Sequence, residues 1–190
     1  GSNVDSKPQH LIQFAIMGQI YAEQVLNINN PRVGLLSIGE EKEKGNKLNT
    51  ETYELIEEET RIGNFIGNVE GRDIFNGSCD VIVCDGFVGN IVLKTTEGVA
   101  SFVFDLLKDT LTSNLKAKIG ALLLKDELKK MKDKVDYRQY GGAPLLGLEG
   151  LVIISHGSSD AQAIYGAIKV AREAVKNNVV SIIASRLNSD

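Results

Sequence analysis

Polar side chains of the kinds that bind anions recur beside glycines in this sequence. Lys44 and Asn46 flank Gly45, and Asn90, which follows another glycine, lies four residues before Lys94. Lysine supplies positive charge, asparagine supplies amide donors, and glycine lets a ligand approach the backbone closely. These residue types suit an inorganic anion, although the charged segment around Lys44 also has the composition of a solvated loop.

Two further groups of polar residues join the candidates. One group precedes Pro8 and contains Asn3, Asp5 and Lys7, and the other follows an apolar run and contains His156, Ser158 and Ser159. A helix that starts near Ser158 presents free N–H groups and hydroxyls, which can bind an anion. Asp160 in its first turn can instead satisfy the same helix dipole. His156 is open to a structural or a functional interpretation.

The stretch DVIVCDGFVGNIVLKTTEG, residues 80–98, is the one around which we expect the site to form. Its apolar run 81–84 is continuous, which predicts a strand covered on both faces by helices. Asp85 then lies at the carboxyl end of the strand, where open α/β sheets bind their ligands. Gly89 allows a sharp turn before a helix from residue 91 onward. The alternative is a plain strand-to-helix turn with Asn90 as the helix cap.

Hydrophobic periodicity places these candidates on a series of helices and strands. The expected elements are a helix over 8–25, strands over 33–38 and 65–66, an acidic helix over 52–59, a helix over 91–112, a strand over 151–154, a helix over 158–175 and a further helix to 187. The turn after residue 66 again puts polar side chains, Glu70, Arg72 and Asp73, beside glycines. Three strands that each end in a polar turn favour one shared cleft.

Length and composition set limits on the kind of protein. With 190 residues, 43% of them hydrophobic, the chain suits one α/β domain or the larger part of a two-lobed one. Cys79 and Cys84 lie on one extended run and cannot bridge, so we expect free thiols and a reducing compartment. No run of 18 apolar residues and no signal sequence is present, and we expect a soluble, cytoplasmic protein. A net charge of −4 argues against a nucleic-acid partner.

Several common motifs are absent from the sequence. It contains no GxGxxG after a strand, no GxxxxGK[ST], no CxxC, no HExxH and no GxSxG. Nicotinamide, nucleotide-hydrolysing, zinc and serine-hydrolase functions therefore lose their main evidence. We expect neither a cofactor nor a metal.

Residues 100–134 predict a helical hairpin with an apolar face. Its second half carries Leu115, Ile119, Leu122 and Leu123 at helical spacing. The window 116–134 holds seven lysines and three acidic residues, a net charge of +4. Such a face packs in the core, packs on a partner subunit or lies on an anionic bilayer surface.

Six segments, in this order, resemble the motifs of the bacterial phosphate acyltransferases of phospholipid synthesis, the PlsX family. They are NVDSKPQHL, GEEKEKGN, FIGNVEGRD, CDGFVGNIVLKTTEG, YGGAPLLG and HGSSDA. The resemblance runs from residue 3 almost to the end of the chain. Family members carry a further N-terminal stretch, so residues 1–190 resemble a C-terminal portion of one enzyme.

The resemblance implies a three-layer α/β/α fold with a mostly parallel sheet, similar to the isocitrate dehydrogenase and phosphotransacetylase group, plus the protruding hairpin. It also implies a homodimer at the cytoplasmic face of the membrane that converts acyl-acyl carrier protein and inorganic phosphate into acyl phosphate. Lys44 and Lys94 would supply charge to the reaction, and Asn46, Asn90 and the N–H groups of Gly45 and Gly89 would supply donors. His156 would be a general acid, and Asp5 and Asp85 would orient lysines.

Two rival functions fit the same residues. The first is a phosphotransacetylase-like enzyme that uses acyl-coenzyme A, which is the same chemistry on a different thiol. The second is a non-catalytic fragment whose hairpin serves dimerisation or membrane docking. Arg72 has two interpretations as well, contact with the acidic carrier protein or support of its own turn.

Overall fold

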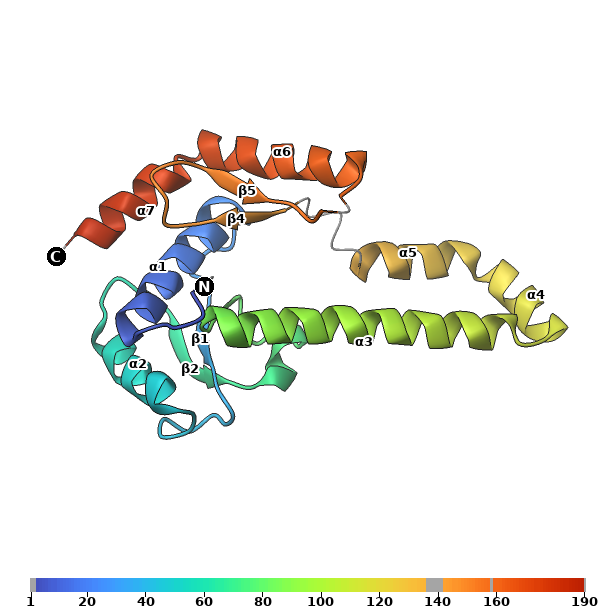
Figure 1. Cartoon of the computed structure of the whole chain (residues 1–190), viewed down its shortest axis with the longest axis horizontal. Coiled ribbons are helices and arrows are strands. Elements are labelled where there is room, and N and C mark those ends of the chain that lie inside the picture. The colour runs from blue at the N-terminus through green and yellow to red at the C-terminus, as the bar shows by residue number, and fades with distance from the viewer. Residues whose placement is uncertain (1–2, 136–141, 158, 190) are drawn as a thin grey trace.

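The computed structural model describes residues 3–135, 142–157 and 159–189. It is a mixed α/β protein (Figure 1). Its elements are α1 (Pro8–Gln24), β1 (Val33–Leu36), α2 (Lys47–Glu58), β2 (Phe65–Val69), the 3₁₀ helix η1 (Gly71–Phe75), β3 (Val81–Val83), α3 (Gly86–Thr112), α4 (Leu115–Leu123), α5 (Lys125–Val135), β4 (Ala143–Leu145), β5 (Val152–Ile154), α6 (Ala161–Lys176) and α7 (Val179–Asn188).

Three parallel strands form the central sheet in the order β2-β1-β3. β1 lies in the middle, and its side chains Val33 and Leu35 are completely buried. Val33 pairs with Phe65 of β2 and with Val81 of β3, so the three strands start level with one another. Because the strands are parallel, their carboxyl ends meet at one edge of the sheet. The sequence predicted this arrangement for its first three strands.

α1 supplies much of the core beside this sheet. Pro8 occupies the first helical position, where its missing N–H costs nothing. Leu11, Ile16 and Ile20 are at most 1% exposed, and the helix packs against α2, α7 and β3. Full burial of each such side chain contributes about 1.5–3 kcal/mol. The apolar stripes of the sequence predicted this buried helix.

Three helices start at other residues than the sequence predicted, and in each case a side chain caps the first turn. α2 starts at Lys47 rather than residue 52, because the Asn46 side chain accepts a hydrogen bond from the N–H of Asn49. α3 starts at Gly86 rather than residue 91, with Asp85 as its cap. The alternative interpretation, with Asn90 as the helix cap, is therefore excluded. α6 starts at Ala161 with Asp160 as its cap.

The strands also differ from expectation. β1 ends at Leu36, two residues before the predicted end at residue 38. In β3 only Val83 is buried, so the two faces of this strand are less completely covered by helices than the sequence predicted. The predicted strand 151–154 corresponds to β5, but β5 pairs antiparallel with β4 in a separate two-stranded sheet. The small parallel sheet agrees with the α/β class, whereas the mostly parallel three-layer arrangement is not seen for β4 and β5.

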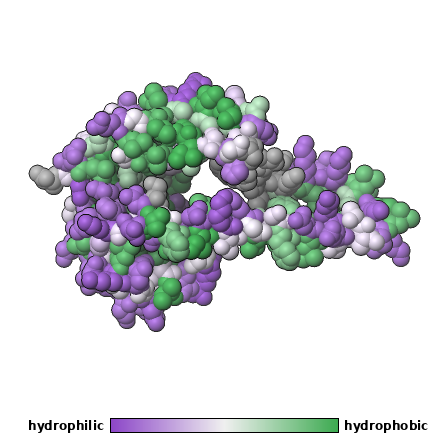
Figure 2. All heavy atoms as spheres, in the orientation of Figure 1, coloured by the Kyte–Doolittle hydropathy of each residue, from purple (hydrophilic) through white to green (hydrophobic). Residues whose placement is uncertain are grey.

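α3, α4 and α5 form a hairpin that projects away from the rest of the protein (Figure 1). No residue of α3 or α4 is buried. Apolar side chains are therefore exposed along its length and at its tip, as the space-filling view shows (Figure 2). Packing within this chain's core, one of the interpretations of the hairpin, is thus excluded for these two helices. Among the described helices, none is both long and apolar enough to cross a bilayer.

Neither Cys79 nor Cys84 forms a disulfide bond, as the sequence predicted. Burial raises the pKa of both the Cys79 and the Cys84 thiol. Cys84 ends the apolar run of β3, and a Cβ atom on Gly89 would lie 3.2 Å from its Sγ atom. A side chain at position 89 would therefore crowd the Cys84 sulfur atom where α3 approaches the end of β3.

We expect a pH-dependent contribution to stability from Arg32 and Asp80. Nε and Nη2 of Arg32 each donate to the Asp80 carboxylate at 2.9 Å, and these hydrogen bonds, with one from the Arg32 backbone, lower the pKa of Asp80 to about 2. The unfolded value lies near 3.8. The stabilisation by ionised Asp80 is therefore complete above pH 4 and disappears as the pH falls through about 2. Asp80→Asn should lower the urea midpoint at pH 7, and the difference from wild type should shrink between pH 4 and pH 2. A constant difference over that range would contradict this origin.

We also expect the Asp85 cap to depend on a side-chain oxygen and not on charge. Asp85 Oδ1 accepts a hydrogen bond from Val88 N at 2.9 Å. Asn caps helices as well as Asp does, whereas Ala at a cap position costs about 1 kcal/mol. Asp85→Asn should therefore keep the wild-type free energy of unfolding, and Asp85→Ala should lose about that amount in urea titrations. Equal losses in the two variants would show that the negative charge matters.

Candidate functional site

The turns after β1 and β2 meet at the carboxyl edge of the parallel sheet. Ser37 N donates to the carbonyl of Val69 at 2.8 Å, which continues the pairing of the two strands past the end of β1. Arg72 lies 2.7 Å from the carboxylate of Glu70 and 3.6 Å from that of Glu40. This contact supports the second interpretation of Arg72, namely that it braces the two turns.

Residues 37–46, which we call the Lys44 loop, follow β1 at this edge. The hydroxyl of Ser37 donates to the Lys44 carbonyl at 3.0 Å and closes the loop. Gly45 has φ +112°, and a Cβ atom there would lie 2.9 Å from the Ser37 hydroxyl oxygen and 2.7 Å from Asn49 Cβ. Both the backbone angle and the space therefore require glycine at this position.

The loop and the start of α2 contain three lysines in different electrostatic situations. Lys42 pairs with Glu57, and Lys47 pairs with Glu51 at 3.6 Å. Lys44 is exposed, and no carboxylate within the described residues lies within 4 Å of its ammonium. Lys44 is thus the lysine of this segment whose charge is not already matched in the described structure.

Asn46 stands between this loop and α2. Its side-chain oxygen accepts from Asn49 N at 3.0 Å, so the oxygen serves as the helix cap. The amide nitrogen of the same side chain can still donate to a ligand. The helix dipole of α2 favours negative charge at this end. A structural and a ligand-binding role are therefore compatible at Asn46.

The carboxyl end of β3 leads directly into α3. Gly86 N donates to the Asn3 carbonyl at 2.8 Å, which holds the segment with Asn3, Asp5 and Lys7 beside the start of α3. Asp5 and Lys7 are exposed, and Lys7 N donates to His10 Nδ1 at 3.2 Å. Gly89 N donates to the Asp85 carbonyl at 3.0 Å inside the helix. The expected N–H donor at Gly89 is therefore already used, and we drop that assignment.

Asn90 and Lys94 lie one turn apart on the same side of α3. Both are exposed. The ammonium of Lys94 lies 2.8 Å from the carboxylate of Glu97, which is itself exposed. An exposed pair of this kind contributes little energy, so Lys94 can exchange its partner for a ligand at small cost. Asn90 and Lys94 thus lie on α3 and not on the Lys44 loop, but like Lys44 they are accessible to a ligand from solvent.

His156 and Ser159 belong to another part of the protein. They follow β5 of the antiparallel sheet, and Ser159 N donates to the His156 carbonyl at 2.9 Å. Asp160 Oδ1 accepts from Ala163 N at 2.9 Å, so the cap of α6 is an acidic side chain. Ser158 lies outside the described residues. The parallel sheet therefore does not bring these candidates to the edge where it places Lys44.

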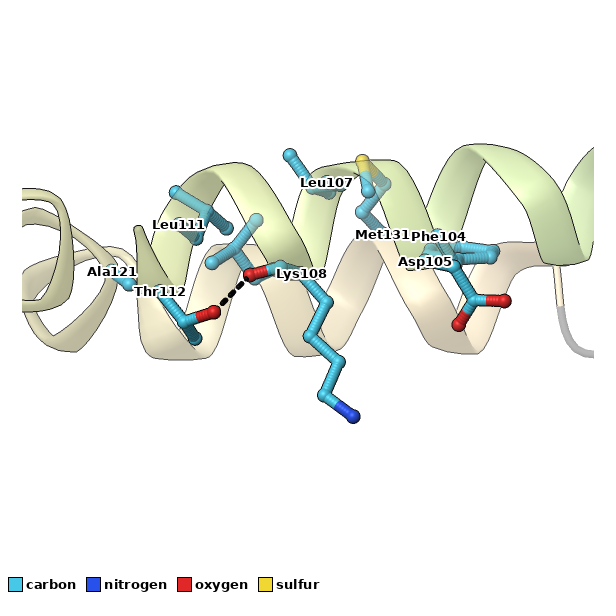
Figure 3. Close-up of a pocket in the computed structure, with 9 residues that line it drawn as sticks. Phe104, Asp105, Leu107, Lys108, Leu111, Thr112, Ala121 and Met131 are labelled. Carbon is cyan, nitrogen blue, oxygen red and sulfur yellow. Dashed lines mark hydrogen bonds between the residues drawn. The ribbon is translucent and has the colours of Figure 1, made fainter. Parts of the chain in front are cut away.

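Two hollows on the surface are lined by apolar side chains. One, of about 430 Å³, lies between α3 and α5, and its lining includes Phe104, Leu107, Leu111 and Met131 (Figure 3). The other, of about 450 Å³, lies between η1 and α3. Neither is lined by Lys44, Asn90 or His156. Within the described residues, no three His, Cys, Asp or Glu side chains gather as a metal site would require.

One polar residue at the sheet edge was not predicted from the sequence. Asn68 lies inside β2, is only 6% exposed, and its Nδ2 donates to the carbonyl of Glu41 at 2.7 Å. The available signal was a single amide in the apolar strand FIGNV. Polar groups buried in a strand need a partner, which here comes from the Lys44 loop.

Comparisons with known proteins agree with the resemblance seen in the sequence. Residues 1–182 match the family model FA_synthesis, described as "Fatty acid synthesis protein". Among curated proteins, the chain is 65% identical to the phosphate acyltransferase of Halothermothrix orenii over 190 residues, which are 100% of this chain and 57% of that protein. It is 54% identical to that of Bacillus licheniformis over 187 residues, 98% of this chain and 56% of the relative.

The phosphate acyltransferase of Bacillus subtilis is 49% identical over 190 residues, again 100% of this chain and 57% of the relative. The chain thus spans a little over half the length of the curated relatives that it matches. Both the match to the family model and the coverage by relatives extend over nearly the whole sequence. The protein therefore belongs to the fatty acid synthesis protein family, whose curated relatives here are phosphate acyltransferases.

Proposed function

We propose that this chain is part of a phosphate acyltransferase that moves a fatty acyl group from acyl-acyl carrier protein to inorganic phosphate. The acyl phosphate then serves phospholipid synthesis. The observation that carries the proposal is the Lys44 loop, which presents an ammonium without a carboxylate partner in the described structure beside the N-terminus of α2. The names of the relatives support the acyl transfer itself.

The proposed reaction needs no protein nucleophile. A phosphate oxygen attacks the thioester carbonyl carbon, a C–O bond forms, the C–S bond breaks, and the carrier thiolate leaves and takes up a proton. Phosphate already carries negative charge at neutral pH. Cys84 is an unsuitable nucleophile because burial raises the pKa of its thiol and keeps it protonated. The protein must therefore hold phosphate against the thioester and stabilise the developing oxyanion.

The candidate residues divide into three roles. Lys44 and Lys94 supply positive charge, and the Asn46 and Asn90 amides and the Gly45 N–H supply oriented donors. His156 is the candidate acid for the leaving thiolate. Further phosphate contacts are assigned to Asn3, Lys7, Ser158 and Ser159. Asp5 would orient a lysine, and Asp85 is kept as the cap that fixes the start of α3. The His156 and Ser159 assignments require the loop after β5 to approach the sheet edge in the complete enzyme.

A single assay tests the proposed function. Acyl phosphate formation is measured with acyl carrier protein and coenzyme A thioesters, for this chain and for a form extended to the full length of its relatives. We expect phosphate-dependent acyl phosphate from the carrier protein thioester in the extended form. Equal or faster turnover of acyl-coenzyme A would favour a phosphotransacetylase-like enzyme. Absence of product from both thioesters in the extended form would refute the proposal.

Lys44 and Asn90 should each matter for turnover. A preorganised donor to a developing oxyanion is typically worth about 10²–10³ in rate. In the full-length enzyme, Lys44→Ala and Asn90→Ala should each reduce kcat/KM by about that factor while the circular dichroism spectrum is unchanged. Lys47→Ala is the matched control, because Lys47 is a nearby exposed lysine that already pairs with Glu51. Normal turnover in Lys44→Ala and Asn90→Ala would remove both residues from the site.

We also propose that the enzyme is a cytoplasmic homodimer that associates peripherally with anionic membranes through the hairpin. Four apolar side chains near its tip are 54–78% exposed: Leu115, Ile119, Leu122 and Leu123. Lys116, Lys118 and Lys125 flank them and can attract anionic headgroups. The exposed apolar side of α3, which includes Val99, Phe102 and Leu106, offers a surface for a second subunit.

Charges at the tip should abolish membrane binding. Leu122 and Leu123 are 71% and 78% exposed, so glutamate at both positions leaves the fold intact but opposes insertion near anionic lipid. Leu122→Glu combined with Leu123→Glu should eliminate sedimentation with phosphatidylglycerol-containing vesicles. The matched control places the same two charges on α6, at Ile164 and Ile168, which are also exposed. If the tip variant still sediments like wild type, another surface makes the contact.

A further inference from the structure

The Lys44 loop is joined to β2 by one shared carbonyl group. The carbonyl oxygen of Glu41 accepts two hydrogen bonds, one from Lys44 N at 3.0 Å and one from Asn68 Nδ2 at 2.7 Å. Asn68 is 6% exposed and belongs to the central sheet, where it pairs in register with Leu35 of β1. The backbone of Lys44 is therefore linked through one acceptor to a side chain that the sheet holds in place.

Stability alone gives a poor reason for an amide at this position. The Oδ1 atom of Asn68 is buried, and it has no hydrogen-bond partner among the described residues. A buried polar atom without a partner destabilises the folded state, and this cost offsets the stability that the Nδ2 hydrogen bond contributes. An apolar side chain at position 68, such as the valine found at the next position, could occupy this place in the strand without that cost. The amide is therefore better explained by what it holds than by the energy of the core.

Position matters for this loop because charges of both signs lie close together in it. A Cβ atom added to Gly39 would lie 2.9 Å from both Glu41 Oε2 and Lys44 Cγ, so the carboxylate and the lysine stem flank the same glycine. A bound anion is attracted by the lysine and repelled by the carboxylate. A shift of the main chain at Glu41 would move both groups and change that balance. The hydrogen bond from Asn68 fixes the main chain at this residue.

We propose that Asn68 is a positioning residue for phosphate, which acts through the Glu41 carbonyl to hold Lys44 at the sheet edge. The proposal rests on the proposed function, since phosphate is the anion that Lys44 would bind. Because Asn68 is only 6% exposed, we assign it no direct contact with substrate. Its loss should therefore weaken phosphate binding and leave the use of the acyl donor unchanged.

Asn64 offers a matched control on the same segment. It immediately precedes β2, and its Nδ2 donates to the carbonyl of Asn30 at 3.1 Å, at the amino end of the sheet. Asn64→Ala thus removes the same kind of hydrogen bond from the opposite edge. A loss of stability that both variants share can in this way be distinguished from an effect on phosphate binding that only the Asn68 variant shows.

The test uses steady-state kinetics of the full-length enzyme with phosphate and acyl-acyl carrier protein varied in turn. Asn68→Ala should raise the KM for phosphate about tenfold, the equivalent of one hydrogen bond, with the KM for the acyl donor within twofold of wild type. In a Lys44→Ala background the same substitution should change the phosphate KM less than twofold, because the two residues act as a unit. Asn64→Ala should leave both KM values unchanged.

An equal shift in Asn64→Ala, or an undiminished effect of Asn68→Ala in the Lys44→Ala background, would overturn the proposal. If Asn68→Ala does not fold, Asn68→Ser, whose side chain is too short to reach the Glu41 carbonyl, should show the same phosphate shift. Amide hydrogen exchange of residues 39–45 gives a readout without catalysis, and it should accelerate about tenfold in the Asn68 variants alone. If wild type forms no acyl phosphate, the proposed function fails, whereas unchanged exchange together with active wild-type enzyme refutes only the role of Asn68.

Discussion

The burial of β1 between two parallel neighbours is the constraint on which the candidate site depends. Val33 and Leu35 are completely buried, and α1 covers the sheet with side chains that are themselves inaccessible. β1 pairs in parallel with both of its neighbours, so the turns that follow the three strands all lie at the same edge of the sheet. The polar turns are therefore neighbours because of core packing, and no attraction between the turns themselves is required.

The electrostatics at that edge follow from which charges are already paired. The segment 40–47 contains three glutamates and three lysines, so its net charge of zero gives no reason for an anion to bind there. Three of these six groups have ion-pair partners: Glu40 pairs with Arg72, Lys42 with Glu57 and Lys47 with Glu51. Within the described residues, Lys44 is the only lysine of the segment without an ion-pair partner. Exposed pairs are individually weak, but they decide which ammonium faces solvent without a partner in the described structure. Local pairing, and not composition, makes Lys44 the candidate for an anion.

Sequence patterns were informative where one property decided the structure. Apolar spacing predicted α1, the parallel strands and the hairpin, because burial or exposure of whole faces governs these elements. Helix starts were less predictable, since Asp85 and Asn46 compete with neighbouring glycines and asparagines for the cap position. Gly89 suggested a turn before the helix, yet it lies inside α3, where it makes room for the Cys84 sulfur atom. Such close approaches are invisible in a one-dimensional pattern.

Long-range relations explain the remaining differences. β4 and β5 have three residues each, too few for periodicity to reveal whether they join a parallel or an antiparallel sheet. The link from Asn68 to Glu41 spans 27 residues, and a single amide in an apolar strand does not identify its acceptor. The sequence could thus place candidates at the ends of strands, but it could not say which of them share a hydrogen-bonded frame.

The length of α3 separates the two activities that we propose for this protein. Its 27 residues span about 40 Å, from the sheet edge at Gly86 to the hairpin tip. Helix propensity alone stabilises an isolated helix only slightly. Because α3 has no buried residues, we expect its exposed apolar side to pack against another surface, which would stabilise it. Lys44 lies on a loop that does not belong to the hairpin. Contact of the tip with a membrane can therefore set where the enzyme works, while the chemistry at the sheet edge depends on a separate set of hydrogen bonds.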